Sequence, residues 1–171
     1  AASLANSTTS YHLLPQHPLI EIQKMQRLPS GEVVITPRNF KLLEELEKSE
    51  KGQGEMSGHI TYGLLDNNDI FMKEWSGSIL GPHRTAFENR IYNLKVTIPE
   101  DYPVVPPQVK FVTKINLNCV DSNGNIDKSR VRAIRSWDRN MGIEQLLISL
   151  RAEMISKDNY RLRQPEEGAH Y

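Results

Sequence analysis

The 171-residue sequence predicts an α+β domain, in which one helix is followed by an antiparallel meander of four strands, a long loop and a second helix packed on the sheet. Two segments repeat apolar residues with a helical period, and the segment between them alternates apolar and polar residues as strands do. We assign residues 33–171 to this domain, because a chain of this size buries a single core. Residues 1–32 are assigned to a flexible N-terminal extension.

The extension is rich in hydroxyl residues and proline and shows neither period. Ser7-Thr8-Thr9-Ser10 is followed by Pro15, Pro18 and Pro29. Such a composition offers too little apolar surface to offset the entropy lost on ordering. We therefore expect a flexible segment, with a short docked stretch at Leu13–Met25, which has some apolar residues, as the alternative.

The first helix begins at Thr36-Pro37, because threonine is a favoured N-cap and proline fits the first helical position. Leu42, Leu43 and Leu46 fall on one side of the helix at about 100° per residue. Gly52 ends it, since glycine adopts the left-handed conformation that follows many helices. Two pairs of opposite charge at spacing i,i+4 support the assignment of this helix: Glu44–Lys48 and Glu47–Lys51.

Four runs rich in apolar and β-branched residues predict the four strands. These runs are His59–Leu65, Ile70–Leu80, Ile91–Ile98 and Gln108–Thr113. The turn-forming residues Asp66-Asn67-Asn68-Asp69 join the first two runs into a hairpin. The third run alternates strictly, so one of its faces is apolar and the other is polar.

After Thr113, a stretch rich in Asn, Asp, Ser and Arg extends to Met141 without a clear period. A loop of this length inside a compact domain is usually functional.

The second helix covers Gly142–Ser156. Its apolar residues recur at helical spacing: Ile143, Leu146, Leu147, Leu150 and Met154.

Charge and composition argue against several classes of function. The 21 basic and 21 acidic residues balance, so no net charge attracts the chain to nucleic acid or to an anionic membrane. No stretch approaches the roughly 18 apolar residues of a membrane span. The single cysteine, Cys119, forms no internal disulfide, which favours a reducing, cytoplasmic and nuclear location. The histidines lack cysteine partners at zinc-ligand spacing, so we expect no metal and no cofactor.

Two apolar residues stand on otherwise polar faces. Phe40 lies about 110° from the leucine stripe of the first helix, beside Glu44 and Glu47. Ile91 lies on the polar face of the third strand. Each has two interpretations: Phe40 either folds back onto the edge of the core or anchors a partner, and Ile91 is either an isolated exposed side chain or part of a contact surface.

Several motifs, by their order and spacing, resemble the ubiquitin-conjugating enzyme family over roughly residues 37–168. Thr113-Lys114-Ile115 precedes Asn123-Gly124-Asn125-Ile126, as in the active-site segment of that family. Further markers are Tyr102-Pro103-Val104-Val105-Pro106-Pro107, Trp137 and Arg163-Gln164-Pro165-Glu166-Glu167-Gly168. The resemblance implies the ubiquitin-conjugating (UBC-like) fold.

The position of the family's catalytic cysteine falls on Asp127, and its His-Pro-Asn motif falls on Leu117-Asn118-Cys119. A carboxylate does not carry ubiquitin as a thioester, which requires a thiol. Asn118 is one place too early to stabilise the oxyanion, and in an extended chain this shift directs it to the opposite side. We therefore expect no catalytic residue, with Asp127 at the cysteine position.

The helix sequence and the Arg-Gln-Pro ending resemble the catalytically inactive E2 variants, which lack the extra C-terminal helices of active enzymes. The resemblance implies a protein that forms a heterodimer with an active ubiquitin-conjugating enzyme and positions an acceptor ubiquitin for lysine-63-linked chains. It assigns these residues to enzyme binding: Pro37, Arg38, Asn39 and Phe40. It assigns these to the acceptor ubiquitin: Thr61, Ser78 and Ile91.

Two other interpretations stay open at this point. One is a ubiquitin- or peptide-binding adaptor like the variants of endosomal sorting, although those carry a proline-rich linker and a coiled coil, and this sequence has no heptads. The other is a conjugating enzyme that forms a thioester through Cys119, although a free cysteine is more often a small buried apolar residue.

Overall fold

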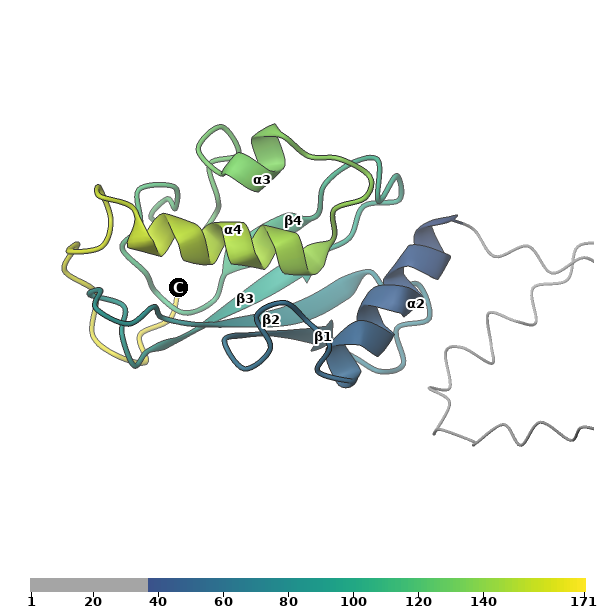
Figure 1. The fold of residues 1–171 in the computed structure, drawn as a ribbon, viewed down its shortest axis with the longest axis horizontal. Helices are drawn as coiled ribbons and strands as arrows, with labels where there is room; N and C mark the ends of the chain where they lie inside the picture. The colour runs from purple at the N-terminus through teal and green to yellow at the C-terminus, as the bar shows by residue number, and fades with distance from the viewer. Residues whose placement is uncertain (1–36) are drawn as a thin grey trace, which may run out of the picture. The chain divides into compact units, whose positions relative to one another are not determined.

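The computed structural model describes residues 37–171, so the predicted extension, residues 1–32, lies outside the described residues. In chain order the elements are α2 (Pro37–Glu50), β1 (Ile60–Leu64), β2 (Glu74–Leu80), β3 (Ile91–Thr97), β4 (Gln108–Phe111), α3 (Arg132–Arg135) and α4 (Ile143–Ile155). Figure 1 shows α4 lying over the sheet and α2 beside β1. The predicted α+β class and the predicted order of elements are confirmed.

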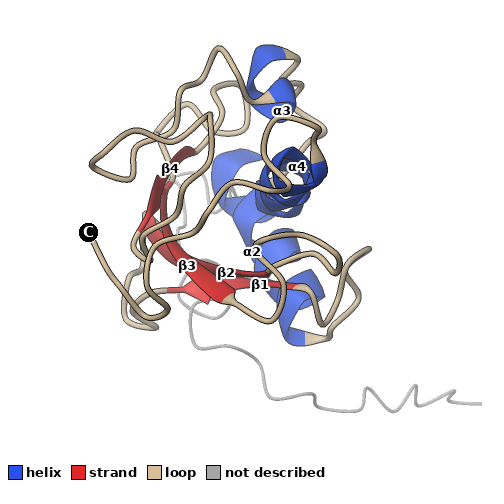
Figure 2. Ribbon diagram, turned by 90° about the vertical axis from the view of Figure 1, so that its left-hand side faces the viewer, coloured by secondary structure: helices blue, strands red, loops and turns tan. Residues whose placement is uncertain are grey.

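The four strands form one antiparallel sheet in the order β1-β2-β3-β4, which is the predicted meander. Its register aligns Thr61 of β1 with Ser78 of β2, and Ser78 with Asn93 of β3. Ile91 lies opposite Leu80 in the same register. In Figure 2 α2 and α4 lie on one side of the curved sheet, so the side chains of the other face point away from the helices.

The core lies between the inner face of the sheet and α4. Its large side chains are fully buried and come from the strands, from α4 and from the loops that close the two ends of the sheet: Trp75, Ile79, Phe87, Tyr92, Val96, Phe111, Leu146, Leu147 and Leu150. In β3 every second residue is buried, as the sequence alternation predicts. Gly77 faces α4, where an added Cβ would lie 3.3 Å from the Leu147 side chain.

The second strand is shorter than predicted, because β2 begins at Glu74 and not at Ile70. The Asp69 carboxylate accepts hydrogen bonds from the backbone N–H groups of Phe71 (3.1 Å), Lys73 (2.7 Å) and Glu74 (3.0 Å). Met72 adopts a left-handed backbone conformation with φ of 48°. These bonds hold the segment before Glu74 as a turn, where it does not pair with β1.

The long passage between β4 and α4 is more ordered than the sequence indicates. Residues 111–119 alternate between buried and exposed, which is typical of an extended chain. The single turn α3 packs on α4, where the Ala133 N–H donates to Ser149 Oγ over 3.2 Å. Isolated bridges join Lys110 to Asn125 and Thr113 to His170, so later segments cover the outer edge of β4.

Of the two predicted i,i+4 ion pairs, one is found and the other is replaced. Lys51 pairs with Glu47, as predicted. Lys48 instead pairs with Glu144 of α4 over 2.5 Å, and the prediction that it pairs with Glu44 is wrong. Glu144 is almost fully buried, so the pair with Lys48 supplies the charge partner that a buried carboxylate requires.

A second buried carboxylate, Glu45, joins three segments. It accepts a hydrogen bond from the Tyr102 hydroxyl and one from the Ile143 backbone N–H over 2.9 Å. The Ile143 N–H is one of the groups that the first turn of α4 leaves without an intrahelical partner. An added Cβ at Gly142 would come within 2.7 Å of the Glu45 carboxylate. Glycine at this position therefore permits the close approach.

We predict that Glu45→Ala lowers the free energy of unfolding by about 3 kcal/mol, because it leaves two buried donors, the Tyr102 hydroxyl and the Ile143 N–H, without an acceptor. Chemical denaturation followed by circular dichroism measures the change. The exposed neighbour Glu44 provides the matched control, since Glu44→Ala removes a carboxylate from the same helix without breaking these bonds. An equal loss in both variants would contradict the bridging role.

The same carboxylate predicts a pH dependence. Burial raises the pKa of Glu45 above its ordinary value of 4.5, against the opposing effect of its hydrogen bonds. The folded state therefore favours the protonated form, and this contribution to stability is lost as the pH rises from 4.5 through the folded pKa. We expect the stability advantage of the wild type over Glu45→Gln to shrink from pH 4.5 toward neutrality. Denaturation at several pH values tests this, and a constant difference would refute it.

Candidate functional site

Asp127, at the position where the family carries its cysteine, has an exposed side chain in the loop before α3. Its Oδ1 accepts hydrogen bonds from the Ser129 hydroxyl (2.6 Å) and backbone N–H (2.9 Å), and its Oδ2 lies 3.4 Å from Arg130 Nε. The bonds from Ser129 lower the pKa of Asp127 below its usual range. The carboxylate is therefore ionised at neutral pH, and its bonds organise the local turn.

Cys119 lies beside Asp127 in space, because the Asp127 N–H donates to the Cys119 carbonyl over 2.8 Å. Their side chains nevertheless point to different environments. The Cys119 side chain is in the core, with 2% of its surface exposed, and burial raises the pKa of its thiol to about 12. A thiol with such a pKa supplies almost no thiolate near neutral pH. The geometry therefore does not favour the interpretation in which Cys119 forms a thioester.

Asn118 lies on the opposite side of the extended segment from Cys119, as the one-residue shift predicts. It is exposed, whereas Leu117 and Cys119 on either side are buried. Its carbonyl accepts a hydrogen bond from Arg130 Nη1 over 3.0 Å. The structure thus places Asn118 and Asp127 at the surface and withdraws the thiol from it.

Phe40 lies in the first turn of α2 with 52% of its surface exposed, so the interpretation in which it folds back onto the core is not supported. The buried side of the helix is formed by Leu42, Glu45 and Leu46. Glu44 and Glu47, which share the outer side with Phe40, are also exposed. An aromatic ring on a charged helix face is suited to insertion into an apolar pocket of another protein.

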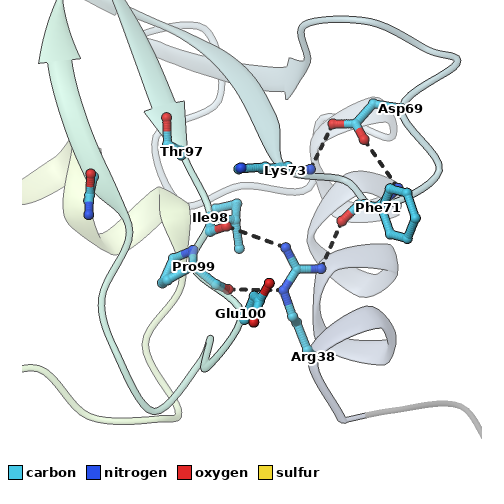
Figure 3. A pocket seen from close by; sticks show the side chains of 9 residues that line it. Arg38, Asp69, Phe71, Lys73, Thr97, Ile98, Pro99 and Glu100 are labelled. Carbon is cyan, nitrogen blue, oxygen red and sulfur yellow. Dashed lines mark hydrogen bonds between the residues drawn. The ribbon is translucent and has the colours of Figure 1, made fainter.

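Arg38 is directed toward this chain itself. Its Nε donates to the Pro99 carbonyl (3.0 Å), and its Nη1 donates to the Phe71 carbonyl (2.7 Å), as Figure 3 shows. Nη1 also lies 3.2 Å from Asn39 Oδ1 and Nη2 lies 3.4 Å from the Ile98 carbonyl. The guanidinium therefore fixes the first turn of α2 to two loops, and contact of Arg38, Asn39 and Pro37 with a partner stays a prediction.

The three residues predicted to contact ubiquitin share the outer face of the sheet. Thr61 and Ser78 lie opposite each other on β1 and β2. Ser78 Oγ donates to Asn93 Oδ1 on β3 over 2.8 Å, which extends the polar row across three strands. Ile91, with 61% of its surface exposed, lies on the same face two residues from Asn93. The face thus combines small polar groups with apolar side chains, because the partly exposed Leu80 lies opposite Ile91.

The loop between β1 and β2, residues 65–73, carries exposed apolar residues that the sequence analysis did not single out. They are Leu65, Ile70 and Phe71. Leu65 was assigned to the predicted first strand, and Ile70 and Phe71 to the predicted second strand, which concealed their position in the exposed loop. A usable signal was available, since Ile70 and Phe71 directly follow the turn-forming residues Asp66–Asp69.

The family model for ubiquitin-conjugating enzymes matches residues 41–169. The chain belongs to the ubiquitin-conjugating enzyme family. It is 49% identical over 138 residues to ubiquitin-conjugating enzyme E2 variant 1B of Arabidopsis thaliana, covering 80% of this chain and 86% of the relative. It is 48% identical over 132 residues to ubiquitin-conjugating enzyme variant MMS2 of Saccharomyces cerevisiae, covering 77% of this chain and 95% of the relative. These relatives place it among the E2 variants of the family.

Solved structures confirm the UBC fold. The human ubiquitin-conjugating enzyme E2 G1 superposes with a TM-score of 0.61 at 27% identity, covering 72% of this chain and 98% of that one.

Within residues 37–171, no helix combines the length and apolar character that crossing a membrane requires. In the same part of the chain, no three His, Cys, Asp or Glu side chains are grouped as metal ligands.

We predict that Cys119 of the folded protein resists alkylation by iodoacetamide near pH 8, because the thiol is buried and its pKa is raised to about 12. Mass spectrometry follows the modification, and denatured protein serves as the control that reacts completely. Rapid alkylation of the folded protein, at the rate of a small-molecule thiol, would show that the thiol is accessible.

Proposed function

We propose that this E2 variant is a non-catalytic subunit that binds an active ubiquitin-conjugating enzyme and positions an acceptor ubiquitin for lysine-63-linked chain assembly. The observation that carries the proposal is the location of the single cysteine, which is buried with a raised pKa while the family's cysteine position holds the exposed Asp127. Without an available thiol, transfer of ubiquitin depends on the thioester of another protein.

Phe40 supports binding of that other protein. Its exposed ring projects from the first turn of a helix that Glu45 and Arg38 hold in place from within the chain. A ring presented on a rigid helix loses little conformational freedom on insertion into a pocket, and buried aromatic residues often dominate the energetics of interfaces.

The outer face of the sheet supports binding of the acceptor ubiquitin. It carries the exposed side chain of Ile91, with the partly exposed Leu80 opposite it, together with the hydroxyls of Thr61 and Ser78. A surface of this kind gives weak binding, because it offers little apolar area. Weak binding is sufficient here, since a heterodimer that orients the acceptor replaces a bimolecular encounter with an intramolecular one.

Reconstituted chain assembly tests the proposal. The assay contains activating enzyme, ATP, an active conjugating enzyme and ubiquitin variants in which one lysine at a time is replaced. We expect chains only when both subunits are present, and loss of chains only for the lysine-63 replacement. Chains formed without the conjugating enzyme, or a reductant-sensitive ubiquitin adduct that Cys119→Ser removes, would refute a non-catalytic role.

We predict that Phe40→Ala weakens heterodimer formation by about 2–4 kcal/mol, roughly 30- to 1,000-fold in Kd, while the fold is retained. Isothermal titration calorimetry with the conjugating enzyme measures the Kd, and circular dichroism monitors folding. Ile155→Ala is the matched control, because Ile155 of α4 is similarly exposed, at 55% against 52% for Phe40. An unchanged Kd for Phe40→Ala would remove the ring from the interface.

We predict that Ile91→Ala raises the KM for acceptor ubiquitin severalfold in chain assembly and leaves the heterodimer Kd unchanged, since Ile91 lies on the outer face of the sheet and not on α2. Val104→Ala is the control, because Val104 has a similarly exposed branched side chain in another part of the surface. If both variants leave the KM unchanged, the outer face is not the acceptor site.

A further inference from the structure

The dipeptide Asn123-Gly124 lies at the tip of a short hairpin, residues 120–126, that follows β4. It is the only Asn-Gly pair in the chain. Val120 and Ile126 form a bridge at the base of the hairpin, and the Asn123 side chain is exposed at its tip. Asparagine amides are thermolabile, and a following glycine has no side chain to shield its backbone nitrogen from the amide carbon. The pair is therefore the candidate deamidation site of this chain.

The folded hairpin holds the atoms of this reaction in place. Gly124 has φ of 86°, and its N–H donates to the Asp121 carbonyl over 3.2 Å. The Asp121 N–H donates to the Asn125 carbonyl over 2.9 Å, so residues 122–124 form a short loop that ends in a left-handed glycine. Asp121 Oδ1 accepts the backbone N–H groups of Asn123 (2.8 Å) and Asn125 (2.9 Å). These bonds oppose ring closure between the Asn123 side chain and the Gly124 nitrogen, because closure requires rotation of the backbone that they fix.

The ring of Tyr171 packs against Gly124. A Cβ added at Gly124 would lie 2.7 Å from that ring and 2.5 Å from the Phe111 carbonyl oxygen. Phe111 also donates its N–H to the Gly124 carbonyl over 2.8 Å, and the Tyr171 N–H donates to the Val112 carbonyl over 3.1 Å. The Tyr171 hydroxyl donates to the Ile115 carbonyl over 3.0 Å. Tyr171 thus joins the hairpin to β4 and to the residues that follow it.

The segment that carries Tyr171 has few of the contacts that hold the sheet together. Residues 161–171 form no helix or strand, and none of their side chains is buried. In contrast, β3 pairs with two strands and places every second side chain in the core. Segments with few buried contacts detach in local opening events whose free energy lies below that of global unfolding. Detachment of this segment removes the ring from Gly124.

We propose that Asn123 is a site of spontaneous deamidation and that docking of Tyr171 on Gly124 sets the rate of the reaction. While the ring is docked, the bonds of Gly124 to Asp121 and Phe111 hold the turn, and the reaction is slow. When the segment detaches, the backbone at Asn123 gains the freedom that ring closure requires. The inference is independent of the proposed function, since Asn123, Gly124 and Tyr171 lie outside α2 and the strands that carry the predicted contact surfaces.

The reaction needs only water as a co-reactant. The Gly124 nitrogen loses its proton and attacks Cγ of Asn123, and a bond forms between these two atoms as the bond from Cγ to Nδ2 breaks. Ammonia leaves with that proton, and the remaining product is a cyclic succinimide. Water then adds to one of the two ring carbonyls and opens the ring. Cleavage at Cγ gives aspartate, and cleavage at the backbone carbonyl carbon gives isoaspartate. No atom is oxidised or reduced.

Either product changes the hairpin permanently. The new carboxylate places another negative charge next to Asp121, whose Oδ1 accepts the N–H of residue 123 over 2.8 Å. Isoaspartate also adds a carbon atom to the backbone of the loop, so Asp121 no longer bonds both N–H groups, those of residues 123 and 125, in the same geometry. Loss of this geometry releases the Gly124 carbonyl from the Phe111 N–H. A transient detachment is thereby converted into a lasting one.

Peptide mapping by mass spectrometry tests the inference on the full chain incubated at mildly alkaline pH. We expect Asn123 to deamidate much faster in denatured than in folded protein, and severalfold faster in Tyr171→Ala than in wild type. Tyr171→Phe is the matched control, because it keeps the ring and loses only the hydrogen bonds between the hydroxyl and Ile115. Its rate is expected to stay closer to that of wild type. Equal rates in folded and denatured protein, or in Tyr171→Ala and wild type, would overturn the inference.

Two further measurements separate local detachment from global unfolding. Glu45→Ala is predicted to destabilise the domain from a different place. We expect it to accelerate deamidation less than Tyr171→Ala does, when circular dichroism shows that both variants are folded. Hydrogen exchange of the wild type needs no variant, and we expect the amides of Gly124 and Tyr171 to exchange faster than those of β3. Equal acceleration by the two variants, or equal protection of these amides and those of β3, would refute control by Tyr171.

The effect of the product is measured on isoaspartyl protein purified after incubation. We expect its Phe111 N–H to exchange severalfold faster than in the unmodified protein, because the acceptor of this N–H is the Gly124 carbonyl. Asn123→Asp adds the charge without lengthening the backbone, and is expected to change this exchange less. Unchanged exchange at Phe111 in the isoaspartyl protein would contradict the consequence assigned to the reaction.

Discussion

The arrangement of this domain depends on the buried carboxylate of Glu45. It comes from α2, receives the hydroxyl of Tyr102 from the loop after β3, and accepts the first free N–H of α4 at Ile143. A negative charge near a helix N-terminus is also favoured by the helix dipole. The ion pair between Lys48 and Glu144 joins the same two helices. Two separate contacts therefore fix the orientation of α2 relative to α4. The outward direction of Phe40 and the position of Arg38 follow from that orientation.

The segment around Asn118, which resembles the active-site segment of the family, illustrates how strand-like alternation determines chemistry. Leu117 and Cys119 are buried, while Asn116 and Asn118 are exposed. Alternate side chains of this extended segment therefore point into the core and into solvent. A cysteine at a buried position contributes packing and loses its reactivity. The exposed Asp127 instead organises a turn through its hydrogen bonds with Ser129, and these bonds outweigh the small effect of desolvation on its pKa.

The periodic elements could be predicted from the sequence because local spacing determines them. The extent of α2 and α4, the meander, and the positions of Phe40 and Ile91 on otherwise polar faces all follow from residues close together in the chain, whereas the exposure of the Phe40 ring was one of two open interpretations. What could not be predicted depends on side chains that bond the backbone or distant residues. Asp69 moved the start of β2 to Glu74 by accepting three N–H groups. Glu144 displaced Glu44 as the partner of Lys48, and Arg38 bonded carbonyls about 60 residues away.

The bridges along β4 have a consequence for self-association. Asn125 covers Lys110, and His170 covers Thr113, while the Tyr171 N–H donates to the Val112 carbonyl over 3.1 Å. An exposed sheet edge offers unpaired N–H and C=O groups that recruit further strands and promote aggregation. Here these groups are satisfied from within the chain along the β4 side. Another protein that binds on this side therefore contacts side chains, because no free strand edge remains there to which it could add a strand.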